Sequence, residues 1–583
     1  MKTEVIKKNL KLLKSTPNLT DYDKFYKNFD PKEAASLIDF QDGKLNAAYE
    51  AIERNANNHR KNKVALYWIG EENQKEKFTY LELNELSNQF ANLLHDLNIE
   101  IGDRVFFFLS RIPELYYSFL GTLKRGAIAG TMFPAFGPQA IEDRLGNSDA
   151  KILVTEPALF DRVAKVAGNL DKLETILVTG NPLEVGKLKI RGKKVLSFQT
   201  QIKDASREYK TRMMDPEDPA FMLYTSGTTG KPKGVVHVHK SIIHEHLSAK
   251  YALDIQDKDV YWCTADPGWV TGIAYSILGS WSNGSSTVVH NGRFDPATWY
   301  QVLQDYKVNI WYTAPTAIRM LMAAGDDLVK KYDLSSLRHL ASVGEPLNPE
   351  PIRWGLKVFG LPFHDNWWQT ETGGILIANY PAMDIKAGSM GKPMPGIHAA
   401  IIGDDGHEVP AGDEGNLAIK PGWPSMMHSL WRRPDKYKSY FEHGWYISGD
   451  RAFKDRDGYF WFIGRADDVI KTSGERVGPF EVESTIIEFP GVIEAGVIGK
   501  PDPLRGEIIK AFIKLKEGVK PTDKLKEEIA EYVKKHLAAH AFPREIEFID
   551  KLPKTRSGKI MRRLLKAKEL GLPLGDTSTL EEF

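Results

Sequence analysis

Apolar residues along the chain repeat with two periods, one typical of helices and one typical of buried strands. Thr79 and Glu82 have the spacing of a helix capping box, and apolar residues follow at helical intervals as far as Leu97. We expect Gly102 to close this helix and the wholly apolar run 105–109 to form a strand inside a parallel sheet. The pattern then predicts a helix over 113–124, a strand over 127–133, a helix from Pro138 and a strand over 152–155. Alternating strands and helices predict a layered α/β fold.

A different pattern fills the chain after Asp467. Residues 509–515 alternate between apolar and polar, as in a strand, and every fourth residue from 525 to 537 is apolar, as on a charged amphipathic helix. This mixture is typical of a small α+β domain. We therefore expect an N-terminal arm with a loose polar pattern over 1–60, a large α/β domain of several subdomains over 61–466, and a small α+β domain over 467–583.

Composition and charge exclude several classes of protein. The 583 residues are 42% hydrophobic and 27% charged, which excludes a mainly disordered chain. Lys and Arg number 78 against 77 Asp and Glu, so the net charge of +1 gives no general case for binding nucleic acid or an anionic membrane. The single cysteine, Cys263, excludes an internal disulfide and a cysteine-rich metal site. Lysines interrupt the apolar runs near the N-terminus, and the charge-free stretch 269–292 is too polar to cross a membrane. The default expectation is a soluble, cytoplasmic protein.

The first motif with chemical content is the glycine- and hydroxyl-rich run 224–234, Tyr-Thr-Ser-Gly-Thr-Thr-Gly-Lys-Pro-Lys-Gly. Small residues let the backbone approach a ligand, while hydroxyls, amides and lysines bind phosphate oxygens. It is not a Walker A loop, because no Gly-Lys-Ser/Thr follows Gly227 at the required spacing and Pro232 blocks an immediate helix. A phosphate-binding loop is the favoured interpretation, and a flexible surface turn is the alternative.

Four further motifs carry weaker signals on their own. Residues 365–373 place a carboxylate among hydroxyls and amides beside two tryptophans, which suits a metal–phosphate site next to an apolar pocket or else a packed aromatic pair before a polar turn. Residues 342–346 resemble a tight turn after a strand. Residues 445–450 end in an aspartate suited to ribose hydroxyls or to a simple turn. Residues 553–563 are either a solvated basic tail or a loop that brings a lysine to an anion.

Taken in this order, the five motifs resemble those of the AMP-forming adenylate-forming ligases, a superfamily of acyl-CoA synthetases, peptide-synthetase adenylation domains and firefly luciferase. The resemblance covers roughly residues 60–570. Within it the chain is most similar to the acetyl-CoA synthetases, on residues 262–272, 342–350 and 367–373. The family implies two steps with ATP, Mg²⁺ and coenzyme A. A carboxylate attacks the α-phosphate of ATP and forms an acyl-adenylate and pyrophosphate, and the thiol of coenzyme A then forms the thioester and releases AMP.

The resemblance assigns a role to each motif residue. The glycine-rich loop would wrap the β- and γ-phosphates, and residues 344–346 would flank the adenine. Asp450 would take the ribose hydroxyls, supported by Arg465, and Glu371 with Thr225 would hold the Mg²⁺ of Mg·ATP. The residues expected to contact ATP or the adenylate are Thr225, Ser226, Gly227, Thr228, Thr229, Gly230, Lys233, Gly344, Glu345, Pro346, Asp365, Asn366, Trp367, Gln369, Thr370, Asp450, Arg465 and Arg476.

The resemblance also implies a moving small domain. Lys559 would be the catalytic residue, with its ammonium between the attacking carboxylate and the α-phosphate, where a cation stabilises the transition state most. The small domain would then rotate about a hinge at Asp467 and bring Ser473 and Gly474 toward coenzyme A, with Lys534 as a further basic contact. Members of the family can be silenced by acetylation of the catalytic lysine, so a lysine acetyltransferase and a deacetylase are candidate partners at Lys559.

The acyl pocket predicts the substrate. In the acetyl enzymes that the chain resembles, a tryptophan at the position of Trp368 forms the pocket floor, and relatives that act on longer acids have a small residue there. The expected pocket residues are Val270, Thr271, Val343 and Trp368. An indole wall excludes extra carbons sterically, so we expect acetate as the substrate and propionate as a poorer one. The run 473–483 resembles medium-chain acyl-CoA synthetases equally well, so a medium-chain fatty acid–CoA ligase is the alternative.

Three other classes are less favoured. A peptide-synthetase adenylation module is expected to have a carrier domain after residue 583 and a group that binds an amino acid's ammonium, and neither is evident. A nucleotide-binding protein without catalysis would be free to lose Lys559, Glu371 and Asp450, yet all three are present. A nucleic-acid-binding or membrane partner is not expected, since the net charge is near zero. The expected partners are acetate, ATP and coenzyme A.

Overall fold

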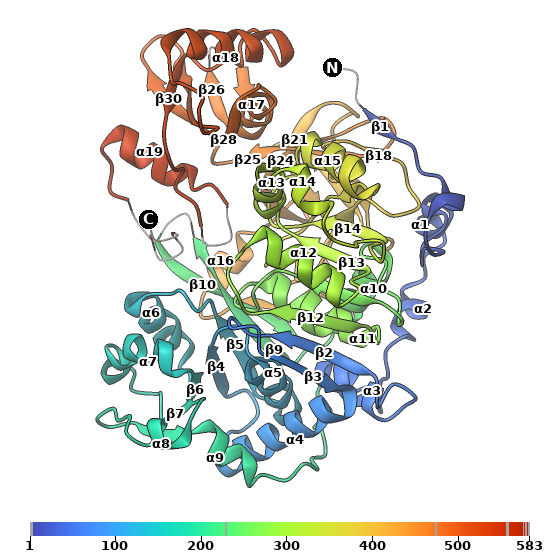
Figure 1. Ribbon diagram of the computed structural model, residues 1–583, viewed down its shortest axis with the longest axis vertical. Coiled ribbons are helices and arrows are strands. Elements are labelled where there is room, and N and C mark those ends of the chain that lie inside the picture. The colour runs from blue at the N-terminus through green and yellow to red at the C-terminus, as the bar shows by residue number, and fades with distance from the viewer. Residues whose placement is uncertain are drawn as a thin grey trace.

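The computed structural model describes residues 4–227, 230–472, 475–555, 559–574, 577 and 580. A large domain built on three main sheets is followed by a small domain with its own sheet (Figure 1). In Figure 1 the sheet of the small domain, in orange and red, lies at one end of the long axis, and the blue and teal elements from α4 to α9 lie at the other. The predicted fold class is confirmed: an α/β protein with a large multi-subdomain N-terminal domain and a small α+β C-terminal domain.

An eight-stranded sheet forms one part of the large domain. Its strands, in spatial order, are β22 (Ser429–Leu430), β10 (Gly230–Val238), β9 (Pro219–Gly227), β5 (Ile128–Met132), β4 (Arg104–Phe108), β6 (Ile152–Thr155), β7 (Thr175–Val178) and β8 (Lys194–Ser197). From β9 to β8 every neighbouring pair is parallel, and the strands from β5 to β7 are almost wholly buried. Consecutive parallel strands are connected by α5 (Pro113–Arg125), α6 (Pro138–Ser148), α7 (Pro157–Ala164) and α8 (Pro182–Val185). Because helices cover the faces of this sheet, the strands are buried, and this explains why their sequences are continuous apolar runs.

A seven-stranded sheet forms the second part. Its strands are β15 (Phe363–His364), β14 (His339–Ser342), β13 (Ile310–Thr313), β11 (Val260–Cys263), β12 (Ser286–His290), β2 (Val64–Ile69) and β3 (Lys75–Thr79). All pairs are parallel except β2 with β3. The associated helices are α10 (Ser241–Tyr251), the π-helix η4 (Gly272–Leu278), α11 (Gly279–Ser282), α12 (Pro296–Asp305), α13 (Pro315–Ala324), α14 (Asp326–Val329) and α15 (Pro349–Phe359).

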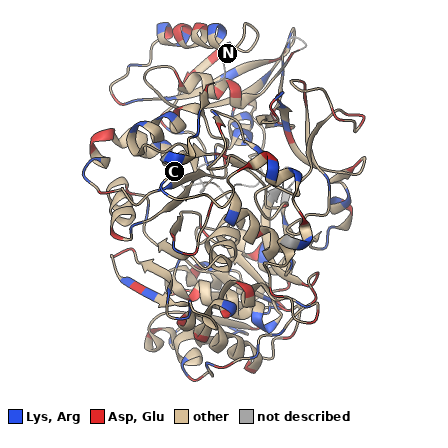
Figure 2. Ribbon diagram, turned by 90° about the vertical axis from the view of Figure 1, so that its right-hand side faces the viewer, with Lys and Arg blue, Asp and Glu red and all other residues tan. Residues whose placement is uncertain are grey.

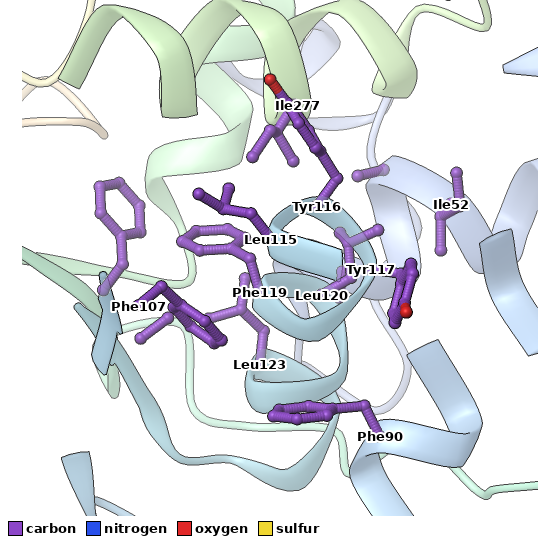
Figure 3. Packing of buried hydrophobic residues seen from close by; sticks show 14 of the residues in the cluster. Ile52, Phe90, Phe107, Leu115, Tyr116, Tyr117, Phe119, Leu120, Leu123 and Ile277 are labelled. Atoms are coloured by element: carbon purple, nitrogen blue, oxygen red, sulfur yellow. The ribbon is translucent and has the colours of Figure 1, made fainter. Parts of the chain in front are cut away.

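The two sheets share one apolar core. Figure 3 shows α5 in its centre, with Ile277 of η4 on one side and Phe107 of β4 and Phe90 of α4 (Tyr80–Asp96) on the other. The Phe90 and Phe107 rings lie 6.2 Å apart. The same cluster contains Ala65 of β2, so helices between the sheets join strands of both into one unit.

A third sheet leads into the small domain. It contains β20 (Ala399–Ile402), β21 (Glu414–Ile419), β24 (Trp445–Lys454), β23 (Phe441–Glu442) and β25 (Phe460–Arg465), all antiparallel. The small domain has the sheet β27 (Glu475–Val477), β26 (Ile470–Thr472), β29 (Gly506–Leu515), β28 (Val492–Asp502) and β30 (Glu545–Phe548), with helices α17 (Pro479–Ile487), α18 (Asp523–His536) and α19 (Arg562–Leu570). Its apolar core is separate from those of the large domain.

The N-terminal arm lies against the large domain. Strand β1 (Val5–Ile6) pairs with β18 (Ile385–Lys386), and α1 (Tyr22–Lys27) and α2 (Pro31–Ala35) follow it down the side of the molecule in Figure 1. Residues 45–56, which include the π-helix η2 (Tyr49–Glu53) and α3 (Arg54–Ala56), belong to the shared core. The arm therefore has apolar contacts with the large domain despite its polar composition.

The expected elements near residue 80 are present, with one difference. Thr79 and Glu82 form the predicted capping box of α4, but the helix ends at Asp96 and not at Gly102. Asn98 takes a left-handed conformation with φ of 56°, which ends the helix before the glycine is reached.

Acidic and basic side chains are interspersed along both domains in Figure 2, in keeping with the even charge balance. Among the described residues, no helix combines the length and the apolar character needed to cross a membrane.

Candidate active site

The glycine-rich loop joins β9 to β10. Thr225 and Lys233 lie opposite each other in the hairpin. The Thr225 hydroxyl oxygen is buried and has no hydrogen-bond partner among the described residues, so it is free to accept a ligand. Thr228 and Thr229 lie outside the described residues, and Ser226, Gly227 and Gly230 are described as strand positions only.

Asp450 on β24 is the centre of a polar cluster. One of its carboxylate oxygens accepts hydrogen bonds from the indole N–H of Trp367 at 2.9 Å and from the Gln369 amide at 3.2 Å. The other oxygen pairs with the Arg465 guanidinium at 3.0 Å. Burial raises the pKa of Asp450, while Arg465 opposes that rise and favours the carboxylate. The cluster brings together residues of two separate motifs, 365–373 and 445–450, and Arg465, which follows the second of them along the chain.

Gln369 extends this cluster to Tyr446. The Tyr446 hydroxyl donates to Oε1 of Gln369 at 2.8 Å, and the Gln369 amide also donates to the Ser448 carbonyl at 3.0 Å. The neighbouring Thr370 carbonyl accepts from the His237 ring at 2.9 Å. Both ends of the Gln369 side chain are therefore fixed by the surrounding structure.

The second polar group joins Lys233 to Glu371 through a tyrosine. The Lys233 ammonium donates to the Tyr440 hydroxyl at 2.6 Å, and that hydroxyl donates to Oε1 of Glu371 at 3.2 Å. Desolvation lowers the pKa of Lys233, and the Glu371 carboxylate opposes this. Lys233 and Glu371 were expected at the phosphates and the metal, but Tyr440 belongs to none of the motifs.

The loop after β14 contains the residues expected to flank the adenine. Gly344 has φ of 93°, which a residue with a side chain rarely adopts, and is exposed beside the half-buried Glu345 and Pro346. Glu345 is held by the Arg319 guanidinium at 2.9 Å and by the hydroxyl of Thr316 at 2.7 Å. Its carboxylate is thus fixed before any ligand arrives.

Asp365 lies beside this loop. Burial raises its pKa to about 8, although the backbone N–H of Leu347 lies 3.3 Å from Oδ2 and opposes the shift. Oδ1 is buried without a hydrogen-bond partner within the described part of the chain. A buried carboxyl oxygen without a partner is available to a ligand, in keeping with the expected place of Asp365 near the edge of the adenine. Asn366 is tied to the Tyr312 hydroxyl at 2.9 Å and to the Ser342 carbonyl at 2.8 Å.

Trp368 lies between two apolar clusters, one that contains Val270 and one that contains Val343. Its ring packs edge to face against Tyr275 with 5.2 Å between centroids, and its indole N–H donates to the Tyr312 hydroxyl at 3.3 Å. Trp368 thus packs against the clusters of two of the expected pocket residues, Val270 and Val343, and the fourth, Thr271, directly follows Val270 at the start of η4. Tyr275 and Tyr312 hold the indole and were not anticipated.

Lys559 comes from the small domain. Its side chain is accessible to solvent. The pKa of Lys559 is nevertheless lowered, first by partial desolvation by the surrounding protein and then by the charge of Arg465, while the Asp450 carboxylate opposes both effects. The ammonium is thus within electrostatic range of the expected ribose-binding carboxylate. Arg562 anchors the start of α19 through Glu483 at 2.5 Å and Asp468 at 3.5 Å. The catalytic role of Lys559 stays a prediction.

The expected coenzyme A contacts stay predictions. Ser473 and Gly474 lie outside the described residues, and of Arg476 only the backbone in β27 is described. Lys534 lies on α18 and pairs with Glu531 at 3.2 Å, on the small domain and away from β10 in Figure 1. Asp467 lies in the turn between β25 and β26, where the chain passes from the large domain to the small one.

The residues expected to hold Mg²⁺ fit such an ion. The free hydroxyl oxygen of Thr225 and the carboxylate of Glu371 are oxygen donors on neighbouring segments, and oxygen donors are what Mg²⁺ prefers. Glu371 has a single side-chain hydrogen bond among those described, to Tyr440. It therefore keeps lone pairs for an ion brought in with a phosphate.

Comparison with known proteins shows the family to which this chain belongs. The model for the AMP-binding enzyme family matches residues 52–431, and that for the AMP-binding enzyme C-terminal domain matches residues 481–559. The chain is 56% identical to the acetyl-coenzyme A synthetase of Bacillus subtilis over 578 residues, which cover 99% of this chain and 100% of that protein. It is 42% identical to the acetyl-coenzyme A synthetase of Methanothrix thermoacetophila, with 93% and 85% covered.

Comparison with solved structures supports the same family. An anthranilate CoA ligase in complex with anthranoyl-AMP superposes with a TM-score of 0.83 at 32% identity, covering 91% of this chain and 98% of that one. An acyl-CoA synthetase of Brucella canis gives a TM-score of 0.74 at 36% identity, covering 95% and 99%. The chain belongs to the AMP-binding enzyme family and, within it, to the family of the acetyl-coenzyme A synthetases.

Proposed function

We propose that the protein is an acetate–CoA ligase, which converts acetate, ATP and coenzyme A to acetyl-CoA, AMP and pyrophosphate through an enzyme-bound acetyl-adenylate. The observation that supports acetate most directly is the Trp368 indole, held by Tyr275 and Tyr312 between the Val270 and Val343 clusters. A methylene in an apolar pocket is worth only ~1–3 kcal/mol, but a fixed indole excludes longer chains by its volume. The name of the Bacillus subtilis relative, 56% identical, points to the same acid.

In the first step an acetate oxygen attacks the α-phosphorus of ATP, and the bond to pyrophosphate breaks. Negative charge builds up between the two reacting anions, where the Lys559 ammonium would supply the compensating charge. Asp450, paired with Arg465, would hold the ribose hydroxyls and fix the α-phosphate in line with acetate. Mg²⁺ held by Glu371 and Thr225 would neutralise phosphate charge.

In the second step the thiol sulfur of coenzyme A attacks the acetyl carbon of the adenylate, its proton is lost, and AMP leaves. Lys559 is not needed at this stage. We propose that the small domain rotates about Asp467, withdraws Lys559 and brings Ser473 and Gly474 to coenzyme A, with Lys534 as a further contact. One site would then serve two reactions in turn.

We also place the reaction in the cytoplasm, where ATP and coenzyme A are available. Lys559 is solvent-accessible, which supports its modification by a lysine acetyltransferase and its restoration by a deacetylase. Acetylation would remove the ammonium charge on which the first step depends.

The test is pyrophosphate release across carboxylic acids from acetate to octanoate, with and without coenzyme A. We expect release with acetate, weaker release with propionate, AMP as the nucleotide product, and acetyl-CoA only when coenzyme A is present. Formation of ADP would contradict the adenylate mechanism. Equal efficiency with octanoate would favour the alternative, a medium-chain fatty acid–CoA ligase.

A further inference from the structure

Tyr440 lies in the turn between α16 (Pro434–Lys438) and β23, at the entrance to the third sheet. Its hydroxyl lies between the Lys233 ammonium at 2.6 Å and the Glu371 carboxylate at 3.2 Å. An ammonium can only donate and a carboxylate can only accept. The hydroxyl therefore accepts from Lys233 and donates its own proton to Glu371, so its direction is fixed by its neighbours.

The ring is held so that the hydroxyl stays in this position. It stacks on Tyr446 with 5.9 Å between centroids and 6° between planes, and Tyr446 is itself fixed by its bond to Gln369. The Tyr440 carbonyl accepts from the backbone N–H of Ile447 at 2.8 Å. A tyrosine hydroxyl is protonated at neutral pH, so it is able to donate to the carboxylate.

The position of the hydroxyl has a consequence for its two partners. Lys233 and Glu371 carry opposite charges and interact electrostatically. Without a group between them they would be drawn into a direct ion pair. Such a pair would use the lysine that is expected at the phosphates and the carboxylate that is expected at the metal. A neutral hydroxyl is a weaker partner for each, so phosphate and metal ion displace it at a smaller cost.

We propose that Tyr440 is a positioning residue that keeps Lys233 and Glu371 apart and oriented to receive the phosphates and the metal ion of Mg·ATP. It acts through these two residues and has no part in bond making or breaking. The proposal rests on the proposed function, because it refers to the same nucleotide site.

The test is Tyr440→Phe, which retains the ring and its stacking on Tyr446 and removes only the hydroxyl. We expect the KM for Mg·ATP to rise about tenfold, as is typical for the loss of a hydrogen bond to a charged group. The KM for acetate should stay within about twofold, and thioester formation from pre-made acetyl-adenylate and coenzyme A should not change, because no β- or γ-phosphate is then bound. A merely structural role would affect all three measurements together.

Tyr437→Phe is the matched control. Tyr437 is a half-buried tyrosine in α16 that packs against Phe441, and its hydroxyl lies in no hydrogen bond described here. This variant should leave the KM for Mg·ATP unchanged. The proposal is overturned if the control has the same effect as Tyr440→Phe, or if Tyr440→Phe leaves the KM for Mg·ATP unchanged.

Binding of Mg·ATP measured by calorimetry without acetate separates the two proposals. If the wild-type protein binds Mg·ATP about tenfold more tightly than Tyr440→Phe but activates no acid, the role of Tyr440 stands and the proposed function fails. If both proteins bind Mg·ATP equally while the wild type makes acetyl-adenylate, the proposed function stands and the role of Tyr440 is refuted.

Discussion

The Trp368 indole is fixed on two sides, by the ring of Tyr275 and by the hydroxyl of Tyr312. A side chain held in this way does not move aside for a longer acid at low cost, because its displacement breaks both contacts. If the proposed pocket is correct, chain-length selection depends on one residue whose position two others determine.

Trp368→Gly should enlarge the pocket and shift the preference toward longer acids. The removed indole leaves space for several methylenes, so the ratio of kcat/KM for acetate to that for octanoate should fall at least tenfold on the scale of ~1–3 kcal/mol per methylene. Pyrophosphate release with both acids measures this ratio. Retained binding of Mg·ATP serves as the control for folding. An unchanged ratio in a folded, nucleotide-binding variant would make Trp368 a packing residue and not the pocket floor.

Lys559→Ala should separate the two half-reactions. Acetate-dependent exchange between ATP and pyrophosphate should fall by about 100-fold or more, because the first transition state loses its cation. Thioester formation from pre-made acetyl-adenylate should be largely retained, since Lys559 has then left the site. Lys568→Ala removes the same charge from an exposed position of α19 and should change neither rate. Equal loss of both half-reactions in Lys559→Ala would refute the two-arrangement mechanism.

At this scale the sequence predicts residues inside motifs and misses those that act from outside them. Asp450, Trp368 and Lys559 have recognisable neighbours along the chain, whereas Tyr440 is 207 residues from Lys233 and 69 from Glu371. Hydrogen bonds across such separations leave no spacing pattern. Tyr446 is an intermediate case, because it lies within the motif that ends at Asp450 and could have been named from it.

At the scale of elements, the N-terminal arm differs most from its sequence pattern. Its polar composition predicts little burial, yet the Lys8 ammonium reaches His364 at 2.8 Å, one residue before Asp365. The other nitrogen of His364 bonds to the Leu340 carbonyl at 2.9 Å and must donate, so the nitrogen that faces Lys8 accepts. A long lysine stem can cover apolar surface while its head finds a polar partner. The pattern of hydrophobic residues along the chain does not predict such a contact.

Lys8→Met should destabilise the protein, because it leaves the buried acceptor nitrogen of His364 without its partner. An unsatisfied buried group costs about 1–3 kcal/mol. Lys7→Met is the matched control. Lys7 is 80% exposed in its ion pair with Asp384, and an exposed pair contributes about 0–1 kcal/mol. Midpoints of urea denaturation compare the two variants, and equal midpoints would argue against a stabilising contact at His364.

Regular elements were easier to predict than their ends. The capping box of Thr79 and Glu82 and the apolar runs of β4 to β6 follow from local chemistry and agree with the structure. The end of α4 does not, because Asn98 takes the left-handed conformation four residues before Gly102, which was expected to close the helix. Asparagine adopts this conformation more readily than most other residues with side chains, but glycine adopts it more readily still, so the sequence favoured Gly102.

At the scale of the whole molecule, the two domains meet along α17. Ser484 of α17 accepts from the Asn348 amide at 2.7 Å, and Phe480 packs edge to face on Phe462 of β25. The same interface places carboxyl groups of the two domains together. Glu350 of α15 interacts electrostatically with Glu488 at the end of α17, and Glu481 in the first turn of α17 interacts in the same way with Glu414 of β21.

We expect these pairs to make the contact between the domains dependent on pH. Burial, and then the interaction with Glu488, raise the pKa of Glu350 above its ordinary value of 4.5, although Arg353 opposes the shift. Arg353 also binds Glu4 of the arm, and Tyr532 of α18 is the other titratable group near the pair. A raised carboxyl pKa means that the protonated pair favours the contact. This stabilisation is complete below pH 4.5 and declines as the pH rises through the raised pKa.

Burial raises the pKa of Glu481 to about 7, and Glu414 adds to the rise, so the second pair has the same sign. Between pH 5 and pH 7 the equilibrium should therefore shift from the arrangement with Lys559 in the site toward the rotated one. The equilibrium constant should change by up to about tenfold for each unit by which a pKa is raised. Glu350→Gln keeps a hydrogen-bond donor for Glu488 and removes the titration, which should weaken this dependence. Addition of Glu481→Gln should abolish it.

Energy transfer between two labels measures the equilibrium. Cys263 is buried, so cysteines introduced at Leu183, 80% exposed in the large domain, and Leu504, 90% exposed in the small domain, can be labelled selectively. Transfer should change between pH 5 and pH 7 in the otherwise wild-type chain and stay constant in the double glutamine variant. Glu528→Gln, on the exposed face of α18, should keep the full pH response. If the double variant responds to pH as the wild type does, the carboxyl pairs do not govern the rotation, and the change must come from groups outside this interface.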